Sequence, residues 1–236
     1  MPSALSALYR RHRYPAEIIT HAVWLYFRFN RSFRDVEELL AEREVQVSYE
    51  TIRRWCAKFG PAFALQLRRR RAQPGDKWHL DEVAIRICGH RHWLWRAVDQ
   101  HGVVLDILVQ SRRDQHAAER FLRQVIDGVG YEPRVVITDK LASYPPAIRR
   151  VLPNVDHRRH KGLNNRAENS HLPVRKRERV MQRFKSTEHV QTFLSVFGPI
   201  GNHFRPRRHR LSASQYRLTR AERFATWRQA VGLHIR

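Results

Sequence analysis

Hydrophobic residues near the start of the chain recur every three or four positions, which is the spacing of amphipathic helices. Pro15 suits the first position of a helix, because an N–H at that position would have no partner within the helix. The apolar stripe that follows consists of Ile18, Ala22, Tyr26 and Phe29. Ser32 and Asp35 then have the spacing of a capping box, which predicts the start of a second helix.

A third helix is predicted from Tyr49 to Phe59, with Ser48 as its N-cap. Its apolar face carries Ile52, Trp55, Cys56 and Phe59, and its polar face carries Glu50, Thr51, Arg53, Arg54 and Lys58. A short helix, a short connection and a basic helix are typical of a helix-turn-helix unit. Thr51, Arg53 and Arg54 are then the predicted DNA contacts. The alternative is an ordinary three-helix bundle whose arginines are only solvated.

Four consecutive arginines close this helical region. Pro61 is predicted to open a further helix, which ends in Arg68, Arg69, Arg70 and Arg71. Residues 73–77 are polar, contain Pro and Gly, and are interpreted as a linker. A run of charges is usually a solvated face. Beside a linker, however, it is well placed to contact DNA phosphates without regard to base sequence.

After Lys77 the apolar period changes from that of helices to that of strands. Two tight turns join the first three strands, which predicts an antiparallel meander. The predicted strands and helices cover residues 78–87, 92–98, 103–110, 114–126, 134–138, 144–151 and 156–158. Their order predicts an α/β fold with a ribonuclease-H-like core, a mixed sheet with flanking helices in which the fourth strand lies beside the first.

The sequence therefore divides into four segments. Residues 1–72 are predicted to form an all-α helix-turn-helix domain, joined by the linker 73–77 to a ribonuclease-H-like catalytic domain at 78–203. Residues 204–236 are predicted to be a basic C-terminal tail with a helix. Apolar residues at helical spacing in this tail could pack on the core or on a second subunit, and the sequence leaves both open.

Three carboxylates lie within or at the ends of predicted strands and helices. Asp81 lies within the first strand, Asp139 ends the fourth, and Glu168 lies at a helix start. Because side chains alternate along a strand, only one of Asp81 and Glu82 can face Asp139. Asp81 is the better candidate, since sites gather at the carboxyl ends of strands; Glu82 is then a solvent-facing or supporting group. The set indicates two hard divalent cations in phosphoryl transfer, and the alternative for Asp81 is a structural ion pair with an arginine.

The charge balance points to a polyanionic partner. Lys and Arg number 45 against 22 Asp and Glu, a formal net charge of +23, and Arg is the commoner cation. No apolar run is long enough to cross a membrane, and the N-terminus lacks the apolar core of a signal peptide. The only cysteines, Cys56 and Cys88, lie in apolar patterns, which favours a reducing, cytoplasmic compartment.

Several motifs, taken in order, resemble one bacterial family. They are residues 78–82, 93–99, 111–114, 137–140 and 164–169, followed by Arg175, Met181 and residues 184–186. They are similar to the catalytic-domain motifs of DDE transposases of the insertion-sequence-six family. The helix-turn-helix segment 47–55 also fits, so the resemblance covers nearly the whole chain.

This resemblance implies that Asp81, Asp139 and Glu168 form the catalytic triad of a ribonuclease-H-like fold and bind Mg²⁺. Two ions per site are expected, with Mn²⁺ able to substitute. The resemblance also implies replicative, cointegrate-forming transposition by a homodimer or larger synaptic complex, in the bacterial cytoplasm at the nucleoid. Arg175 stands seven residues after Glu168, where the family carries a basic residue that contacts DNA.

Further basic residues follow the third carboxylate. Arg175, Lys176 and Arg179 fall near one helical face if the helix from Glu168 continues, although Pro173 would kink that helix. We interpret them as the DNA-binding side of the active site, and a solvated basic face is the alternative.

The expected function is a DNA transposase that binds the terminal inverted repeats of its element, cleaves their 3′ ends and joins them to target DNA. One departure from the family stands out: 28 residues separate Asp139 from Glu168, a handful fewer than usual. A catalytically decayed copy is therefore one alternative. A helix-turn-helix transcription regulator and a structural nucleic-acid-binding protein are the others, and neither has a reason to carry three matched carboxylates.

Overall fold

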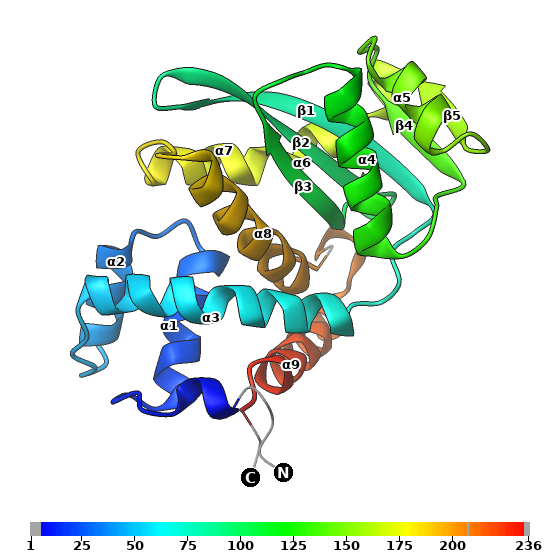
Figure 1. The fold of residues 1–236 in the computed structure, drawn as a ribbon. Coiled ribbons are helices and arrows are strands. Elements are labelled where there is room, and N and C mark those ends of the chain that lie inside the picture. Colours follow the sequence, from blue (N-terminus) through cyan, green and yellow to red (C-terminus); the bar gives the residue numbers. More distant parts are fainter. Residues whose placement is uncertain (1–5, 207, 234–236) are drawn as a thin grey trace. The chain divides into compact units, whose positions relative to one another are not determined.

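The computed structural model describes residues 6–206 and 208–233, and it divides into two compact units (Figure 1). One unit combines Met1–Arg71 with Val196–Arg236, and the other spans Ala72–Ser195. The first boundary, between Arg71 and Ala72, precedes the expected linker at 73–77. The second differs from the expected one, because the C-terminal segment joins the N-terminal helices instead of standing apart as a tail.

Among the described residues of the N-terminal unit, every regular element is a helix. Its elements are η1 (Ser6–Tyr9), α1 (Ala16–Arg28), α2 (Phe33–Ala41), α3 (Tyr49–Arg70), the end of α8 (Thr187–Phe204), η3 (Arg208–Arg210) and α9 (Ala213–Ala230). The capping box that begins α2 is confirmed: Ser32 and Asp35 exchange two side chain–backbone hydrogen bonds of 3.0 Å. Ser48 likewise caps α3, accepting from the N–H of Thr51 at 3.3 Å.

The prediction that Pro61 opens a separate helix is wrong, because α3 is continuous through Pro61. A proline within a helix removes one backbone hydrogen bond, at a cost of roughly 3 kcal/mol. The burial of Phe59, Phe63 and Leu67 along one face offsets that cost. Gly60 allows α1 to approach here, since a Cβ at this position would lie 3.1 Å from the Phe27 ring.

The C-terminal segment completes this helical core. Helix α8 continues through Pro199 to Phe204, although Gly198 and Pro199 are residues that usually end a helix. From α9, Trp227 packs edge-on against Phe63 at 5.5 Å, and Phe224 lies 5.1 Å from Phe204. The apolar residues of α9 therefore pack within the same chain. Arg207 and residues 234–236 of the expected tail lie outside the described residues.

The second unit contains a five-stranded mixed sheet in the order β3-β2-β1-β4-β5 (Figure 1). Its strands are β1 (Lys77–Ile87), β2 (His90–Asp99), β3 (Val104–Gln110), β4 (Val135–Thr138) and β5 (Asp156–Arg159). The first three form an antiparallel meander, and β4 and β5 add to it in parallel with β1. This topology confirms the predicted ribonuclease-H-like core, with the fourth strand beside the first.

Helices flank this sheet. They are α4 (Gln115–Val129), α5 (Tyr144–Val151), α6 (Asn165–Ser170), α7 (Leu172–Val180) and the start of α8, with η2 (Lys161–Leu163) before α6. Figure 1 shows α4 lying across one face of the sheet, where Trp78, Trp95 and Phe121 belong to the buried core. The helix expected to continue from Glu168 is instead two helices. The chain breaks at His171, because Pro173 cannot donate a hydrogen bond back into α6.

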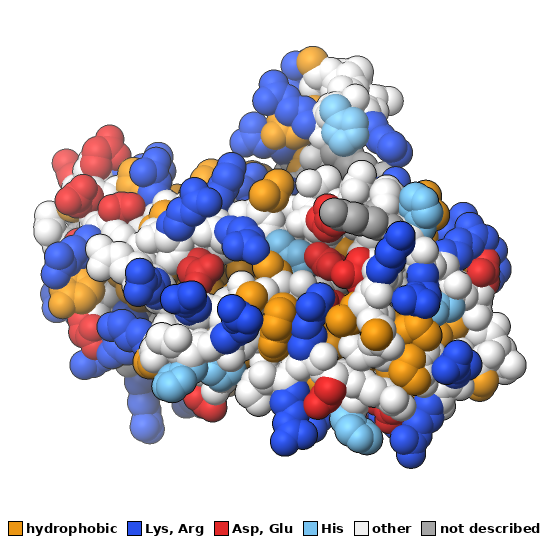
Figure 2. Space-filling view, turned by 90° about the horizontal axis from the view of Figure 1, so that it is seen from above, with side chains coloured by type: hydrophobic (Ala, Val, Ile, Leu, Met, Phe, Trp, Pro, Cys, Tyr) orange, Lys and Arg blue, Asp and Glu red, His pale blue; other side chains and the backbone are white. Residues whose placement is uncertain are grey.

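Two global features bear on function. No helix among the described residues is long and apolar enough to cross a membrane. Lys and Arg side chains are spread over the face seen in Figure 2, with acidic side chains in small groups among them. This distribution fits the net charge of +23 and a polyanionic partner.

Candidate active site

Asp81 and Asp139 lie side by side at neighbouring strands. In the parallel pairing of β1 with β4, Leu80 stands opposite Thr138, and the two aspartates are the next residues of their strands. Both side chains are half-buried. The pairing therefore places the backbones of the two aspartates at adjacent positions of neighbouring strands.

Asp81 faces the side of the sheet that carries α6 and α7. His171, the residue between these helices, places its Nε2 3.3 Å from Oδ2 of Asp81, and only 14% of the Asp81 side chain is exposed. Burial, reinforced by the positive charges of Arg96 and Arg175, lowers the pKa of His171 although Asp81 opposes the shift. The imidazole is therefore neutral near pH 7 and can orient the carboxylate without adding a positive charge.

Asp139 begins the turn that leads into α5. Its Oδ1 accepts a hydrogen bond from the N–H of Leu141 at 2.9 Å, which fixes the carboxylate relative to its own backbone. Leu141 in turn accepts from the N–H of Tyr144, the first residue of α5. Asp139 is thus held by the turn that follows it, as is usual for an acid at a strand end.

The third carboxylate, Glu168, is carried to the same strands by a short connection. After β5, the N–H of His160 donates to the carbonyl of Thr138 at 3.0 Å. Buried Asn164 then donates from Nδ2 to the carbonyl of Leu80 at 2.8 Å. Glu168 follows one helical turn later, is exposed, and accepts at its carbonyl from the N–H of His171.

These three acids have the right donors for a hard divalent cation, since carboxylate oxygens suit Mg²⁺ and Mn²⁺. They come from the interior of β1, the residue after β4 and the first turn of α6, and part of each side chain is accessible. Within the described residues, however, no three His, Cys, Asp or Glu side chains already converge as a closed metal site. Asp81 is engaged by His171 and Asp139 by its own turn, so binding an ion would require the side chains to rotate toward one another.

Glu82, which the sequence left as either a solvent-facing or a supporting group, does not face solvent. Alternation turns it to the α4 and α5 face, where its side chain is fully buried. Arg113 Nε donates to Oε1 at 2.8 Å and Tyr144 Oη donates to Oε2 at 2.7 Å. Burial raises the pKa of Glu82 to about 7, the nearby charge of Asp139 adds to the shift, and the bonds from Tyr144 and Arg113 oppose it. The signal in the sequence was a second acid beside Asp81 within an apolar strand.

The basic residues expected beside the site are exposed on α7. Arg175, Lys176 and Arg179 all face solvent, as a DNA-binding surface requires. Arg177 differs from them: it is fully buried, and its guanidinium lies over the Phe193 ring at 5.4 Å. One arginine of this segment is therefore part of the core, while its neighbours remain available to a ligand.

In the N-terminal unit, the predicted recognition helix is the first half of α3. Arg53 and Arg54 are exposed and Thr51 is half-buried. Arg53 donates two hydrogen bonds to Glu50, of 2.9 and 2.6 Å, and Arg54 lies 3.7 Å from the same carboxylate. Glu50 thus partly neutralises the surface that was expected to contact DNA.

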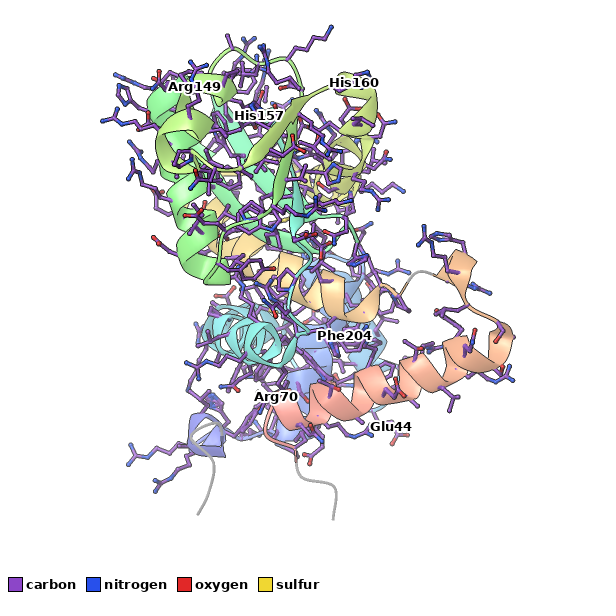
Figure 3. The ribbon with its side chains drawn as sticks, turned by 90° about the vertical axis from the view of Figure 1, so that its right-hand side faces the viewer. Glu44, Arg70, Arg149, His157, His160 and Phe204 are labelled. Atoms are coloured by element: carbon purple, nitrogen blue, oxygen red, sulfur yellow. The ribbon has the colours of Figure 1, made fainter. Side chains whose placement is uncertain are left out.

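The arginine run at the end of α3 is accessible only in part. Arg69 and Arg70 are exposed, whereas Arg68 and Arg71 are half-buried. Arg70, labelled in Figure 3, donates to the backbone carbonyl of Gln66 at 3.2 Å. Of the four, Arg69 and Arg70 therefore offer the most surface to a polyanion.

Comparison with known proteins identifies the family. The profile of the DDE domain of IS240-type transposases matches residues 75–207, which include all three carboxylates. The chain belongs to this transposase family. The transposase for the insertion sequence-like element IS431mec of Staphylococcus aureus (strain Mu50 / ATCC 700699) is 33% identical over 175 residues, which are 72% of this chain and 78% of that protein.

Two further matches are a second transposase and a solved catalytic core. The transposase of IS257 in transposon Tn4003 of Staphylococcus aureus is also 33% identical over 175 residues, with the same coverage of both chains. The HTLV-2 integrase catalytic core domain, solved in complex with magnesium, is 15% identical with a TM-score of 0.36. That match covers 48% of this transposase and 87% of the integrase chain.

The transposase is accordingly an enzyme of DNA strand transfer with a DDE domain. The chain therefore does not belong to a family of transcription regulators. The region that matches is the catalytic domain, not the helix-turn-helix segment alone. The predicted resemblance to bacterial insertion-sequence transposases is confirmed.

Proposed function

We propose that this transposase binds the terminal inverted repeats of its element, cleaves the 3′ ends and joins them to target DNA. The observation that supports this proposal most is the register of β1 and β4. Asp81 and Asp139 directly follow Leu80 and Thr138, the last paired residues of the two strands. Glu168 follows on α6, which Asn164 ties to the same strand. Turned toward one another, carboxylates from these three separate elements would supply the oxygen ligands that phosphoryl transfer with divalent ions requires.

Asp81, Asp139 and Glu168 would hold two Mg²⁺ ions, for which Mn²⁺ could substitute. Bound there, the ions would activate the attacking oxygen and stabilise the leaving oxygen of an in-line displacement. The protein's own part is to hold the three carboxylates in position. His171 contributes to this as a neutral neighbour of Asp81.

The remaining steps concern the DNA. Arg175, Lys176 and Arg179 would bind phosphates beside the carboxylates, and the exposed face of α3 would bind the terminal repeats. Water would be the nucleophile in the first displacement and the freed 3′-hydroxyl in the second. We further propose that two or more copies act together in a synaptic complex, and that the reaction is replicative, as the family resemblance implies.

The short interval between Asp139 and Glu168 does not remove an element of the fold. It still holds α5, β5, η2 and the start of α6. His160 and Asn164 carry the chain across the ends of β4 and β1 by the two hydrogen bonds described above. This continuity favours an active enzyme over a catalytically decayed copy.

The proposal is tested by incubating the full chain with labelled DNA carrying the ends of its own element, together with a target plasmid. With Mg²⁺ we expect nicks at the 3′ ends and joined products, and with EDTA neither. Tight binding of the ends without any nick would instead favour a decayed transposase or a DNA-binding regulator.

A further inference from the structure

Glu82 is an ionisable group that the proposed chemistry does not use directly, although it neighbours Asp81 in the chain. Its side chain is fully buried on the opposite face of the sheet. A carboxylate in such a place is strongly disfavoured unless its oxygens are bonded. Both oxygens are bonded here, one by Arg113 and the other by Tyr144. The arrangement is thus a polar network at the edge of the apolar core, in which Glu82 and Tyr144 are fully buried and Arg113 is partly exposed.

The network joins three elements of the sheet domain. Arg113 comes from the segment between β3 and α4, and its guanidinium also lies over the Trp93 ring at 4.6 Å. Tyr144 is the first residue of α5 and is fully buried, with its ring edge-on to Trp95 at 5.7 Å. Each partner of Glu82 is itself fixed by an aromatic ring, so the network has little freedom to move.

Its position matters because backbone pairing stops just before the carboxylates. The ladder between β1 and β4 ends at the pair Leu80–Thr138, one residue short of Asp81 and Asp139. Beyond this point the bond from Tyr144 to Glu82 links β1 to the turn that contains Asp139. The other end of that turn is held by the Asp139 carboxylate itself, through the N–H of Leu141.

We propose that Glu82 is a positioning residue for the metal site. Through Tyr144 it holds the Asp139 turn against β1, and through Arg113 it is itself held in place. The hydrogen bonds of Glu82, on the face of the sheet opposite Asp81, thereby set the distance between the Asp81 and Asp139 carboxylates. This inference rests on the proposed function for the identity of the site, and it adds Glu82, Tyr144 and Arg113 to the residues on which metal affinity depends.

The test uses the full-length Tyr144→Phe variant, which removes one hydroxyl and keeps the ring. Mn²⁺ binding is measured by titration calorimetry, and Mg²⁺ dependence by cleavage of end DNA. Loss of a residue that orients metal ligands typically lowers metal affinity or activity about ten-fold or more. We therefore expect Mn²⁺ binding to weaken by about that factor. The Mg²⁺ concentration for half-maximal cleavage should rise in parallel, while binding of end DNA in EDTA stays unchanged.

The chain offers a matched control in Tyr131→Phe. The Tyr131 hydroxyl donates to the backbone carbonyl of Pro74 and its ring contacts Trp78 at 6.1 Å, in the same domain but away from Asp139. This variant should lose thermal stability with unchanged Mn²⁺ affinity. The Glu82→Gln change provides a second test. Combined with Tyr144→Phe, it should weaken Mn²⁺ binding by less than the product of the two single effects, because both act on one network.

Parental Mn²⁺ affinity in a folded Tyr144→Phe variant would overturn the inference and reduce Glu82 to a purely structural role. Failure of the parental chain itself to bind Mn²⁺ would overturn it as well. If the parental chain binds Mn²⁺ but does not cleave DNA, the proposed function fails. The positioning role is then decided by the ratio of the Mn²⁺ affinities alone.

Discussion

The buried side chain of Asn164 donates a hydrogen bond of 2.8 Å from Nδ2 to the backbone carbonyl of Leu80. Leu80 immediately precedes Asp81, and Asn164 lies one helical turn before Glu168. A single side-chain contact thus ties the helix with the third carboxylate to the strand with the first. The position of Glu168 in the proposed triad should be sensitive to this contact, because α6 is only six residues long and has little stability of its own.

Replacing Asn164 with Ala should therefore impair cleavage more than stability. Leaving the buried Leu80 carbonyl unpaired costs about 1–3 kcal/mol of unfolding free energy. A shift of Glu168 by about 1 Å would lower the cleavage rate by roughly 100-fold. Rates on end DNA and urea unfolding of both proteins check this expectation. Ala at the exposed Asn165 is the matched control and should change neither quantity.

Arg175 and Arg177 make a second pair for comparison, since they are two residues apart but one is exposed and one is buried. Arg175→Ala should leave stability unchanged and weaken DNA binding, with the slope of log affinity against log salt falling by about 1. Arg177→Ala should lower unfolding free energy by about 3 kcal/mol, because its guanidinium packs on Phe193 in the core. Equal stability losses in the two variants would contradict this division.

Glu50 is expected to weaken DNA binding by the N-terminal unit. It holds Arg53 by two hydrogen bonds and lies 3.7 Å from Arg54. Glu50→Gln should free both arginines and strengthen binding of terminal-repeat DNA several-fold at low salt. Glu42→Gln removes an equally negative side chain from α2 next to Arg43, and should have a smaller effect. A weaker affinity of Glu50→Gln would show that Glu50 itself contacts the DNA bases.

The N-terminal unit should lose stability in mild acid. Burial lowers the pKa of His203, whose Nε2 is bonded to the carbonyl of Arg223 at 2.7 Å. The unfolded chain therefore binds more protons than the folded chain below about pH 6.5, so unfolding free energy falls as pH decreases through that range. Urea unfolding at several pH values should show this loss. In His203→Gln the loss should be smaller, and an identical pH dependence would contradict the assignment.

Much of the sheet domain could be predicted from the sequence, because its strands have clear apolar periods and end in Gly or Asp turns. The parallel placement of residues 134–138 beside residues 78–87 followed from the order of elements alone. Local sequence patterns could not predict that the Glu82 side chain is buried and hydrogen-bonded. Its burial depends on Arg113 and Tyr144, which are 31 and 62 residues away in the chain.

The helical unit was less predictable for a different reason. Pro61 and Pro199 are local signals for helix boundaries, yet both lie inside long helices. Packing of apolar residues on both sides of each proline outweighs one missing hydrogen bond, and only the tertiary structure reveals that balance. The joining of the C-terminal helix to the N-terminal helices is equally non-local, since Phe63 and Trp227 are far apart in sequence.

The most direct test of the proposed catalytic role of Asp81 compares the parental chain with Asp81→Ala on labelled DNA carrying the ends of its own element. The account predicts nicking at the 3′ ends that requires Mg²⁺ and is absent from the variant, with unchanged binding of the ends. Cleavage by the variant at the parental rate would contradict it, because Asp81 would then take no part in the chemistry.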